Sequence, residues 1–290
     1  MNYSLSIKEK DSVITDFILN FSNPPKIMGI VNVTPDSFYD GGKYSFSTNA
    51  MVKHGLNLIE EGADILDIGG ESSRPGAYPV SESEEIDRII PVIEDIRSKS
   101  DIPISVDTYK SKVADYAMES GANWINDISG LKFDDTMMEV VQKWNCPVVI
   151  MHMQGTPQSM QLDPNYEDVV AELIDFFSER IERLNQANIK KIIIDPGIGF
   201  GKSLNHNLEL LNQIERFKGF NLPVLVGASR KSFIGKILDN DVDDRLSGSL
   251  AVLNWLGINN IDIIRVHDVK ESVESIKILK SIMNIKNNHN

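Results

Sequence analysis

The chain has 290 residues, of which 41% are hydrophobic and 24% charged, an ordinary composition for a folded protein whose core needs no disulfide or metal. A net charge of −13 argues against a nucleic-acid binder, which normally carries a basic surface. No apolar stretch approaches the ~20 residues of a membrane span. Cys146 is the single cysteine and we recognise no secretory signal, so we expect a cytoplasmic protein with no membrane partner.

Eight short apolar runs alternate with segments of helical period, and this alternation is the main pattern of the sequence. The runs occupy residues 27–34, 64–70, 102–108, 124–129, 147–153, 191–197, 223–229 and 261–268. The helical segments occupy roughly residues 48–61, 82–99, 110–120, 134–144, 166–187, 204–218, 230–257 in two pieces, and 270–283. The pattern predicts an α/β fold, a single-domain (β/α)₈ TIM barrel over residues 26–285, preceded by an N-terminal extension of residues 1–25.

Each apolar run ends at a side chain that can take part in chemistry. These side chains are Asn32, Asp67, Asp107, Asn126, His152, Asp195, Ser229, and Arg265 with His267. In a (β/α)₈ barrel the carboxyl ends of all eight strands meet on one face, and that face carries the active site. Long loops at residues 35–47 and 71–81 follow the first two runs, and we expect them to act as lids.

The segment DPGIGFGK at residues 195–202 combines a strand-end carboxylate with three closely spaced glycines. A backbone without side chains can approach a flat ligand closely. The alternative interpretation is a helix-capping Asp195 followed by a flexible turn. Because the glycine spacing differs from that of GxxxxGK[ST], the segment is not a P-loop.

The segment GASRKS at residues 227–232 indicates an anion site. If Ser229 is the N-cap, then Arg230, Lys231 and Ser232 fall in the first helical turn. Cations in that turn oppose the helix dipole, which costs roughly a few tenths of a kcal/mol each. A bound anion would offset this cost and use the free backbone N–H groups. The alternative is a solvated pair of charges.

Arg265 and His267 lie two residues apart on the predicted last strand, so their side chains point to the same side. An arginine beside a histidine at a strand end favours phosphate binding. His152 has no such neighbour, and its position favours neither a structural nor a functional role.

Two acids and one amide, Asp107, Asn126 and Asp195, end three of the predicted strands. A carboxylate accepts two parallel hydrogen bonds from a ligand edge with adjacent N–H donors, and an amide serves a neighbouring donor–acceptor pair. The set suits the guanidine-like edge of a heterocycle; the alternative role is to cap loop amides at the barrel top. No set of His, Cys or Glu has zinc spacing, and no Gly-x-Ser-x-Gly elbow is present.

Eight motifs in chain order make the sequence similar to the dihydropteroate synthase family over about residues 26–283. They are MGIVNVTPDSFYDGG (28–42), DIGGESSRPGA (67–77), SVDTYK (105–110), INDISG (125–130), MHMQGTP (151–157), DPGIGFGK (195–202), SRKSFIG (229–235) and RVHDV (265–269). The resemblance implies a homodimeric pterin-binding barrel that requires Mg²⁺. Its implied reaction condenses 6-hydroxymethyl-7,8-dihydropterin pyrophosphate with p-aminobenzoate, and the products are 7,8-dihydropteroate and pyrophosphate.

The resemblance also implies a role for each matching position. The pterin-binding set is Asp107, Asn126, Met151, Asp195, Phe200, Lys231 and Arg265. The pyrophosphate set is Asn32, Ser73, Arg265 and His267, with Asn32 as the Mg²⁺ ligand. The p-aminobenzoate set is Phe38, Arg74, Pro75 and Ser232. The catalytic residues implied are Asp107, Lys231, Arg265 and His267.

Small departures from the family pattern and two other classes complete the interpretation. Tyr39 stands where a smaller residue is common, and Ser73 stands where Thr is frequent. We expect sulfonamides to be competitive inhibitors. A methyltetrahydrofolate-dependent methyltransferase domain shares a DPGxGFG-like segment, but it needs neither the TPDSF loop nor the SRKS segment. A catalytically silent barrel would have lost polar groups at the strand ends, and here all are present.

Overall fold

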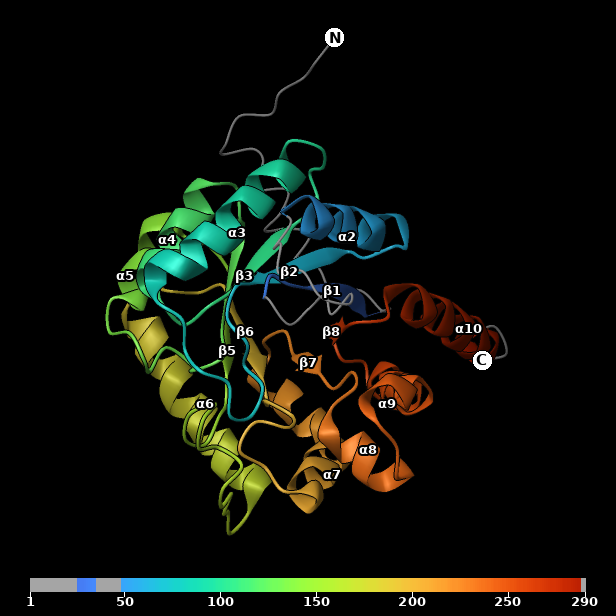
Figure 1. Cartoon of the computed structure of the whole chain (residues 1–290). Helices are drawn as coiled ribbons and strands as arrows, with labels where there is room; N and C mark the ends of the chain where they lie inside the picture. The colour runs from blue at the N-terminus through green and yellow to red at the C-terminus, as the bar shows by residue number, and fades with distance from the viewer. Residues whose placement is uncertain (1–24, 35–47, 288–290) are drawn as a thin grey trace.

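The structure, a computed structural model, describes residues 25–34 and 48–287. Within these residues eight parallel strands form a ring, and helices cover its outside (Figure 1). The strands are β1 (Lys26–Asn32), β2 (Ile65–Gly69), β3 (Ile104–Asp107), β4 (Trp124–Asp127), β5 (Val148–Met151), β6 (Ile192–Asp195), β7 (Leu225–Gly227) and β8 (Ile263–Val266). The predicted (β/α)₈ barrel is confirmed, and the predicted N-terminal extension lies almost entirely outside the described residues.

Helices alternate with these strands. The α-helices are α2 (Thr48–Glu60), α3 (Glu82–Arg97), α4 (Ser111–Glu119), α5 (Met137–Trp144), α6 (Val169–Gln186), α7 (Leu204–Asn212), α8 (Ser232–Leu238), α9 (Leu246–Ile258) and α10 (Val269–Asn287). Two 3₁₀ helices, η2 (Ile214–Phe220) and η3 (Val242–Asp244), follow α7 and α8. The predicted helix over residues 204–218 is therefore two pieces of different pitch. No helix in the described part of the chain is both long and apolar enough to cross a bilayer.

The ring of strands closes at a single weak seam. The hydrogen-bonded order is β6-β5-β4-β3-β2-β1-β8-β7, and each neighbouring pair is parallel. Between β6 and β7, Ile194 forms an isolated bridge with Val224, and its N–H donates to the Pro223 carbonyl at 3.0 Å. Closure places the carboxyl ends of all eight strands around one opening.

An apolar layer fills the barrel interior below that opening. It contains one buried residue from each of seven strands: Met28, Ile65, Trp124, Val149, Ile193, Leu225 and Ile263. Side chains two positions further along a strand point to the same face. The next inward positions are therefore Ile30, Asp67, Asn126, Met151, Asp195, Gly227 and Arg265. The alternation that builds the apolar layer thus also sets the polar strand-end residues directly above it.

Outside the ring, one apolar face of each helix packs on the strands. In α6, Leu173 and Phe177 are fully buried, and the Phe177 ring meets the edge of Phe217 from η2 at a centroid distance of 6.0 Å. The Asp168 side chain caps the N-terminus of α6 by accepting hydrogen bonds from the N–H groups of Val170 and Ala171. Such packing fixes the strands, and thereby the strand ends, in one arrangement.

Candidate active site

The register between strands brings the strand-end side chains together. Asp107 on β3 is the register partner of Asn126 on β4, and Met151 on β5 is the partner of Asp195 on β6. Asn126, Met151 and Asp195 are each at most 6% exposed. The prediction that these side chains share the mouth of the barrel agrees with this placement.

Arg265 links two carboxylates across the opening. Its Nε donates to Asp67 Oδ2 at 2.6 Å, and its Nη2 donates to Asp107 Oδ2 at 2.8 Å. Asn126 Nδ2 also donates to Asp67 Oδ2, at 3.1 Å. Asp67, to which the sequence interpretation gave no role, is fully buried and holds both the guanidinium and the amide in place. Its position at the end of an apolar run was a signal for such a role.

The ionisation of Asp107 depends on its burial and on the charges around it. Burial, followed by the neighbouring Asp67 carboxylate, raises the pKa of Asp107 to about 7, although Arg265 opposes the shift. Asp107 can therefore change its charge near neutral pH. A carboxylate with this property at the mouth of a barrel is a candidate functional group.

A second cluster lies on the β6 side. The Asp195 carboxylate accepts a hydrogen bond from the Gly197 N–H at 2.8 Å, and burial raises the pKa of Asp195. Lys231 donates to the Ile198 carbonyl, and its Nζ lies 4.4 Å from the centroid of the Phe200 ring. Burial lowers the pKa of Lys231 to about 8, against the opposing effect of Asp195. Met151 and Phe200, the two apolar members of the predicted pterin-binding set, pack in one apolar cluster.

The glycine-rich turn packs directly against neighbouring backbone. Gly197 has φ of +67°, and a Cβ there would lie 2.0 Å from the His152 carbonyl oxygen. A Cβ on Gly201 would lie 2.6 Å from the Gln154 carbonyl oxygen, and one on Gly199 would lie 2.9 Å from Lys231 Cδ. The glycines are therefore required by packing against the protein itself, and the flexible-turn alternative does not fit such packing. The predicted approach of this backbone to a flat ligand stays a prediction.

Lys202 and His152 hold the β5 and β6 loops together. Lys202 is 2% exposed, and its Nζ bonds the carbonyls of His152 and Phe200 and lies 3.1 Å from His152 Nδ1. Burial and then the Lys202 charge lower the pKa of His152 to about 2, so the imidazole is a neutral acceptor. The question left open for His152 is thus answered in favour of a structural role. The sequence offered no signal for this contact, because its partners are 50 residues apart.

The rim of the opening corrects one expectation. Helix α8 begins at Ser232, not directly after Ser229, and Lys231 is its N-cap residue. Arg230 adopts a left-handed φ of +56° and forms an ion pair with Asp268 at 2.6 Å, so it does not enter the first helical turn. The Ser229 Oγ instead lies 3.1 Å from His267 Nδ1. Arg230 stays outside the helix because two contacts hold it. Its guanidinium donates to the Asp268 carboxylate, and its backbone N–H donates to the Ser249 hydroxyl.

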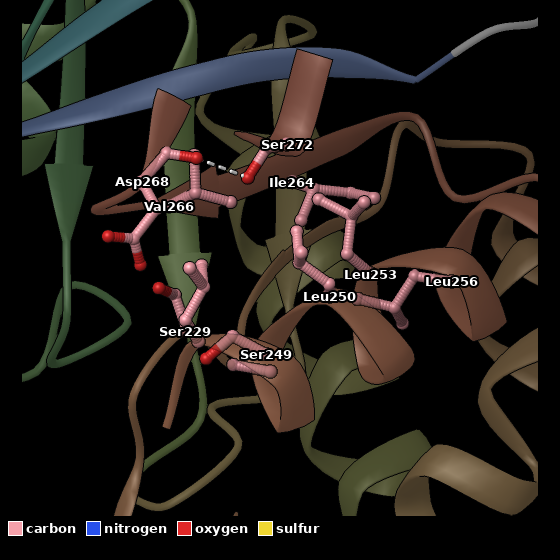
Figure 2. Close-up of a pocket in the computed structure, with 11 residues that line it drawn as sticks. Ser229, Ser249, Leu250, Leu253, Leu256, Ile264, Val266, Asp268 and Ser272 are labelled. Carbon is pink, nitrogen blue, oxygen red and sulfur yellow. Dashed lines mark hydrogen bonds between the residues drawn. The ribbon is translucent and has the colours of Figure 1, made fainter. Parts of the chain in front are cut away.

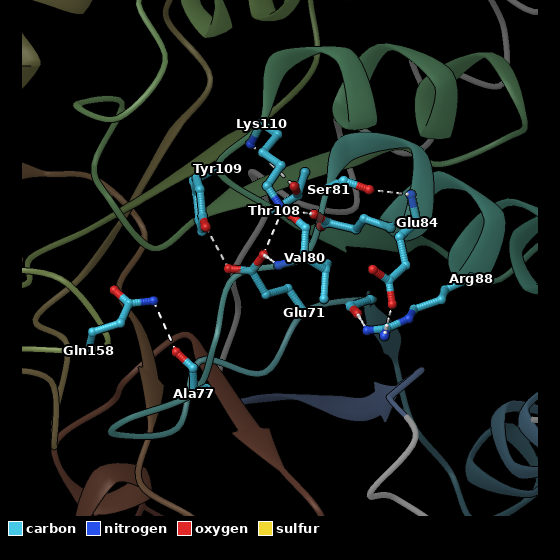
Figure 3. Close-up of polar contacts among 12 residues, drawn as sticks. Glu71, Ala77, Val80, Ser81, Glu84, Arg88, Thr108, Tyr109, Lys110 and Gln158 are labelled. Carbon is cyan, nitrogen blue, oxygen red and sulfur yellow. Dashed lines mark hydrogen bonds and ion pairs between the residues drawn. The ribbon is translucent and has the colours of Figure 1, made fainter. Parts of the chain in front are cut away.

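The remaining predicted residues lie further out. Asn32 is half-buried at the end of β1, beside Gly69 in the strand register. Arg74, Pro75 and Ser232 are exposed and Ser73 is half-buried. Phe38 and the loop over residues 35–47 lie outside the described residues. The other predicted lid, residues 71–81, is joined by hydrogen bonds to the β3–α4 and β5 turns (Figure 3).

A small cavity lies behind the strand ends and is distinct from the barrel mouth. Its volume is about 10 Å³, and it lies between β8 and α9, with Leu253, Leu256 and Ile264 among its lining residues (Figure 2). A space of this size holds about one water molecule. Ser272 donates to the Asp268 carbonyl at its edge. The cavity is a packing feature between sheet and helices and is too small for a substrate.

Comparison with known proteins defines the class. Residues 28–267 match the family described as pterin binding enzyme. A barrel with buried acids, an amide and a lysine at its mouth, together with this match, defines a pterin-binding barrel enzyme.

Three relatives narrow the class. The dihydropteroate synthase of Escherichia coli is 48% identical over 91% of this chain and 94% of its own length. The crystal structure of the Yersinia pestis dihydropteroate synthase with a sulfonamide drug has a TM-score of 0.85 and 44% identity, and covers 90% of this chain and 94% of that one. The Xanthomonas albilineans dihydropteroate synthase with 4-aminobenzoic acid has a TM-score of 0.85 and 43% identity, with the same coverage. The chain belongs to the dihydropteroate synthase family, which is a family of transferases.

The raised pKa of Asp107 predicts how this residue changes the pH dependence of the free energy of unfolding. The folded value of about 7 exceeds the ordinary value of 3.8, so between these values the native state holds a proton that the unfolded state releases. The contribution of Asp107 to the free energy of unfolding therefore falls as pH rises through this window. We expect the Tm of Asp107→Asn to rise relative to wild type by a few degrees between about pH 5 and about pH 8. Thermal unfolding curves at several pH values measure this, and parallel Tm profiles would contradict it.

Proposed function

We propose that this chain condenses 6-hydroxymethyl-7,8-dihydropterin pyrophosphate with p-aminobenzoate, giving 7,8-dihydropteroate and pyrophosphate. The observation that carries the proposal is the buried layer of hydrogen-bonding groups at the barrel mouth, formed by Asp107, Asn126 and Asp195 with Lys231 beside them. This layer suits a flat neutral heterocycle. The carboxylates can accept hydrogen bonds from N–H groups on the ring edge, and Lys231 can donate to a ring oxygen. The ligands of the relatives, 4-aminobenzoic acid and a sulfonamide drug, support the same reaction.

The pterin ring would lie between polar edges and apolar walls. Asp195 would accept hydrogen bonds from the 2-amino group and the adjacent ring N–H, with Asn126 pairing beside it. Lys231 would donate to the ring oxygen, for which its position next to Asp195 is suitable. Met151 and Phe200, already in one apolar cluster, would contact the ring faces. Arg265 would cover the ring while Asp67 fixes its guanidinium.

The pyrophosphate would bind at the rim, through Arg265, His267, Ser73 and Asn32. His267 lies beside Ser229 and is exposed at the end of β8. Among the described residues no group of three or more His, Cys, Asp or Glu could hold a metal ion. A single amide oxygen from Asn32 nevertheless fits Mg²⁺, which binds few protein ligands, keeps several waters and uses substrate phosphates. When bound, the ion would neutralise part of the pyrophosphate charge.

The p-aminobenzoate side would be formed by Arg74 and Pro75 on the loop after β2, Ser232 at the start of α8, and Phe38. Ser232 would receive the benzoate carboxylate. Arg74 and Pro75 would lie against the aromatic ring. Sulfonamides carry a similar aniline ring, so we propose that they compete for this part of the site.

The reaction would proceed by early departure of the leaving group. The bond between the exocyclic carbon and the pyrophosphate oxygen breaks, and its electron pair leaves with pyrophosphate, whose charge is partly neutralised by Arg265. His267 donates a hydrogen bond to the leaving group as a neutral imidazole, because desolvation and the Arg265 charge lower its pKa to about 4. The carbon becomes a cation conjugated with the dihydropterin ring. Ionised Asp107 stabilises that cation electrostatically, and the aniline nitrogen then forms the new C–N bond and releases a proton. No covalent enzyme intermediate is required.

We further propose that the chain acts as a homodimer in the cytoplasm. The apolar sequence of residues 250–256 supports this only in part, because Leu253 and Leu256 are buried within the subunit. Trp255 and Ile258 on α9 are 42% and 52% exposed, and such side chains are common at interfaces. A second copy covering them would bury this apolar surface.

The direct test of the function measures pyrophosphate release. We expect purified protein with dihydropterin pyrophosphate to release pyrophosphate at a substantial rate only after p-aminobenzoate is added, with one dihydropteroate formed for each pyrophosphate. A sulfonamide should slow the reaction, and excess p-aminobenzoate should restore it. Pyrophosphate release that does not respond to p-aminobenzoate would overturn the proposal.

Replacing Asp107 should separate catalysis from binding. In Asp107→Asn the carboxylate that stabilises the cation is lost, so we expect kcat to fall by ~100-fold or more. Binding of the pterin alcohol should weaken by less than about tenfold, because the other polar contacts remain. Since the ionised form is required, wild-type kcat/KM should rise with pH through about 7, with this step absent in the variant. Equal losses in kcat and in binding would indicate that Asp107 only anchors the ring.

Removing the proposed magnesium ligand should change the metal requirement. We expect EDTA to abolish activity and Mg²⁺ to restore it. In Asn32→Ala, the Mg²⁺ concentration for half-maximal activity should rise by about tenfold or more, because one of few protein ligands is lost. Calorimetric binding of pyrophosphate should require a correspondingly higher Mg²⁺ concentration in the same variant, and an unchanged Mg²⁺ requirement would contradict the role of Asn32. Asn57→Ala, which changes an exposed asparagine on α2, is the matched control and should behave as wild type.

A further inference from the structure

The loop after β2 carries three of the proposed substrate contacts, and one side chain joins its two ends. Glu71 is the first residue of residues 71–81, and its Oε2 accepts a hydrogen bond from the Val80 N–H at 2.9 Å (Figure 3). Just before it, the Gly70 carbonyl accepts a hydrogen bond from Arg88 on α3 at 2.6 Å. Ser73, Arg74 and Pro75 lie between these fixed ends.

Glu71 is itself held by the turn after β3. The Tyr109 hydroxyl donates to Glu71 Oε1 at 2.5 Å, and Lys110 Nζ donates to Glu71 Oε2 at 2.6 Å. Lys110 Nζ also donates to Glu85 Oε2 at 2.6 Å and to the Val80 carbonyl at 2.8 Å. The ammonium group thus uses all three of its N–H donors, and two of them reach the ends of the same loop.

The Glu71 network (Glu71, Glu85, Tyr109 and Lys110) is mostly shielded from water. The side chains of Lys110, Glu71 and Glu85 are 12%, 8% and 1% exposed. Burial alone would lower the pKa of Lys110, but hydrogen bonds with the two glutamates raise it. Desolvating three charges is expensive, and apolar residues of similar volume often stabilise a fold as well or better. The contacts of the network fix the geometry of the loop ends, whereas its net contribution to the free energy of unfolding is small or unfavourable.

The middle of the loop has a separate support. The Gly76 N–H donates to the Pro157 carbonyl at 3.1 Å, and Gln158 Nε2 donates to the Ala77 carbonyl at 3.0 Å. Both partners lie in the turn after β5. Arg74 and Pro75 are left exposed between the two attachments. The expectation of a freely moving lid at residues 71–81 does not fit these contacts.

We infer that Glu71, Tyr109 and Lys110 are positioning residues for the loop that carries the p-aminobenzoate contacts. The inference rests on the proposed function for the roles of Arg74 and Pro75. A loop that is already ordered loses less conformational freedom when a ligand binds, so affinity is higher than with a mobile loop. Asp195 and Asn126 lie on other strands and Lys231 lies at the start of α8, so these contacts to the pterin ring do not depend on the network.

Two substitutions weaken the network without leaving a buried charge unpaired. Tyr109→Phe removes one hydrogen bond and keeps the ring that contacts Phe133 edge-on at 5.4 Å. Glu71→Gln keeps acceptor and volume, while Lys110 retains Glu85 as its partner. The matched controls are Tyr116→Phe on α4, whose side chain is 46% exposed, and Glu82→Gln on α3, whose ion pair with Lys112 is largely exposed.

Three measurements on the full chain test the inference. Hydrogen–deuterium exchange of residues 72–80 should be faster in both network variants than in wild type. The KM for p-aminobenzoate should rise by about tenfold in Glu71→Gln and by about threefold in Tyr109→Phe, since hydrogen bonds to charged groups are the stronger ones. The Kd of 6-hydroxymethyl-7,8-dihydropterin, which lacks the pyrophosphate, should stay within about twofold of wild type because its polar contacts are intact. Both controls should match wild type in all three.

Each other outcome overturns the inference in a recognisable way. Unchanged exchange in folded network variants would show that the network does not hold the loop, whatever the activity. Faster exchange with an unchanged KM would show that the loop does not serve p-aminobenzoate. Parallel losses in pterin binding, KM and kcat would indicate a purely structural role. If wild type itself lacks the activity, the proposed function fails, while the exchange measurement still decides whether the network holds the loop.

Discussion

The period-two alternation of β-strands, applied around a closed ring, is the constraint on which this site depends. Ile65 and Asp67, Trp124 and Asn126, and Ile193 and Asp195 are each two residues apart, so each pair points into the barrel. The lower members form the apolar layer and the upper members form the polar one. A shift by one residue in β2 or β6 would send an acid outward into the helix layer. The same apolar packing that stabilises the barrel therefore fixes the chemistry at its mouth.

Charge balance within this layer divides the opening into two environments. The buried carboxylates of Asp67 and Asp195, and the Asp107 carboxylate, whose side chain is 13% exposed, face two cations, Lys231 and Arg265. Burial raises the pKa of Asp107 and lowers that of Lys231, so both groups move toward their neutral forms. Such an interior favours an uncharged ring with several N–H groups over an anion. A highly charged leaving group is better suited to the rim, where water still reaches the side chains.

Local sequence patterns could predict the barrel and most of the strand-end residues, because both follow from hydrophobic periodicity. They could not predict the contacts that join distant segments. The role of Asp67 depends on Arg265, which is 198 residues away, and the neutral state of His152 depends on Lys202. The start of α8 was placed too early because an ion pair with Asp268 draws Arg230 into a left-handed conformation. The loop at residues 71–81 has the composition of a mobile loop, and only its tertiary contacts reveal that it is held.

The glycine-rich turn and the exposed residues at the barrel opening differ in how well they tolerate substitution. At Gly197, Gly199 and Gly201 any larger residue would meet backbone or the lysine stem within 3 Å, so drift at these positions is blocked by sterics regardless of selection on the ligand. Arg74, Pro75 and Ser232 face solvent and meet no such barrier. Substitutions at the turn are therefore limited by packing whatever the ligand, whereas those at the exposed positions are limited only by what these side chains bind.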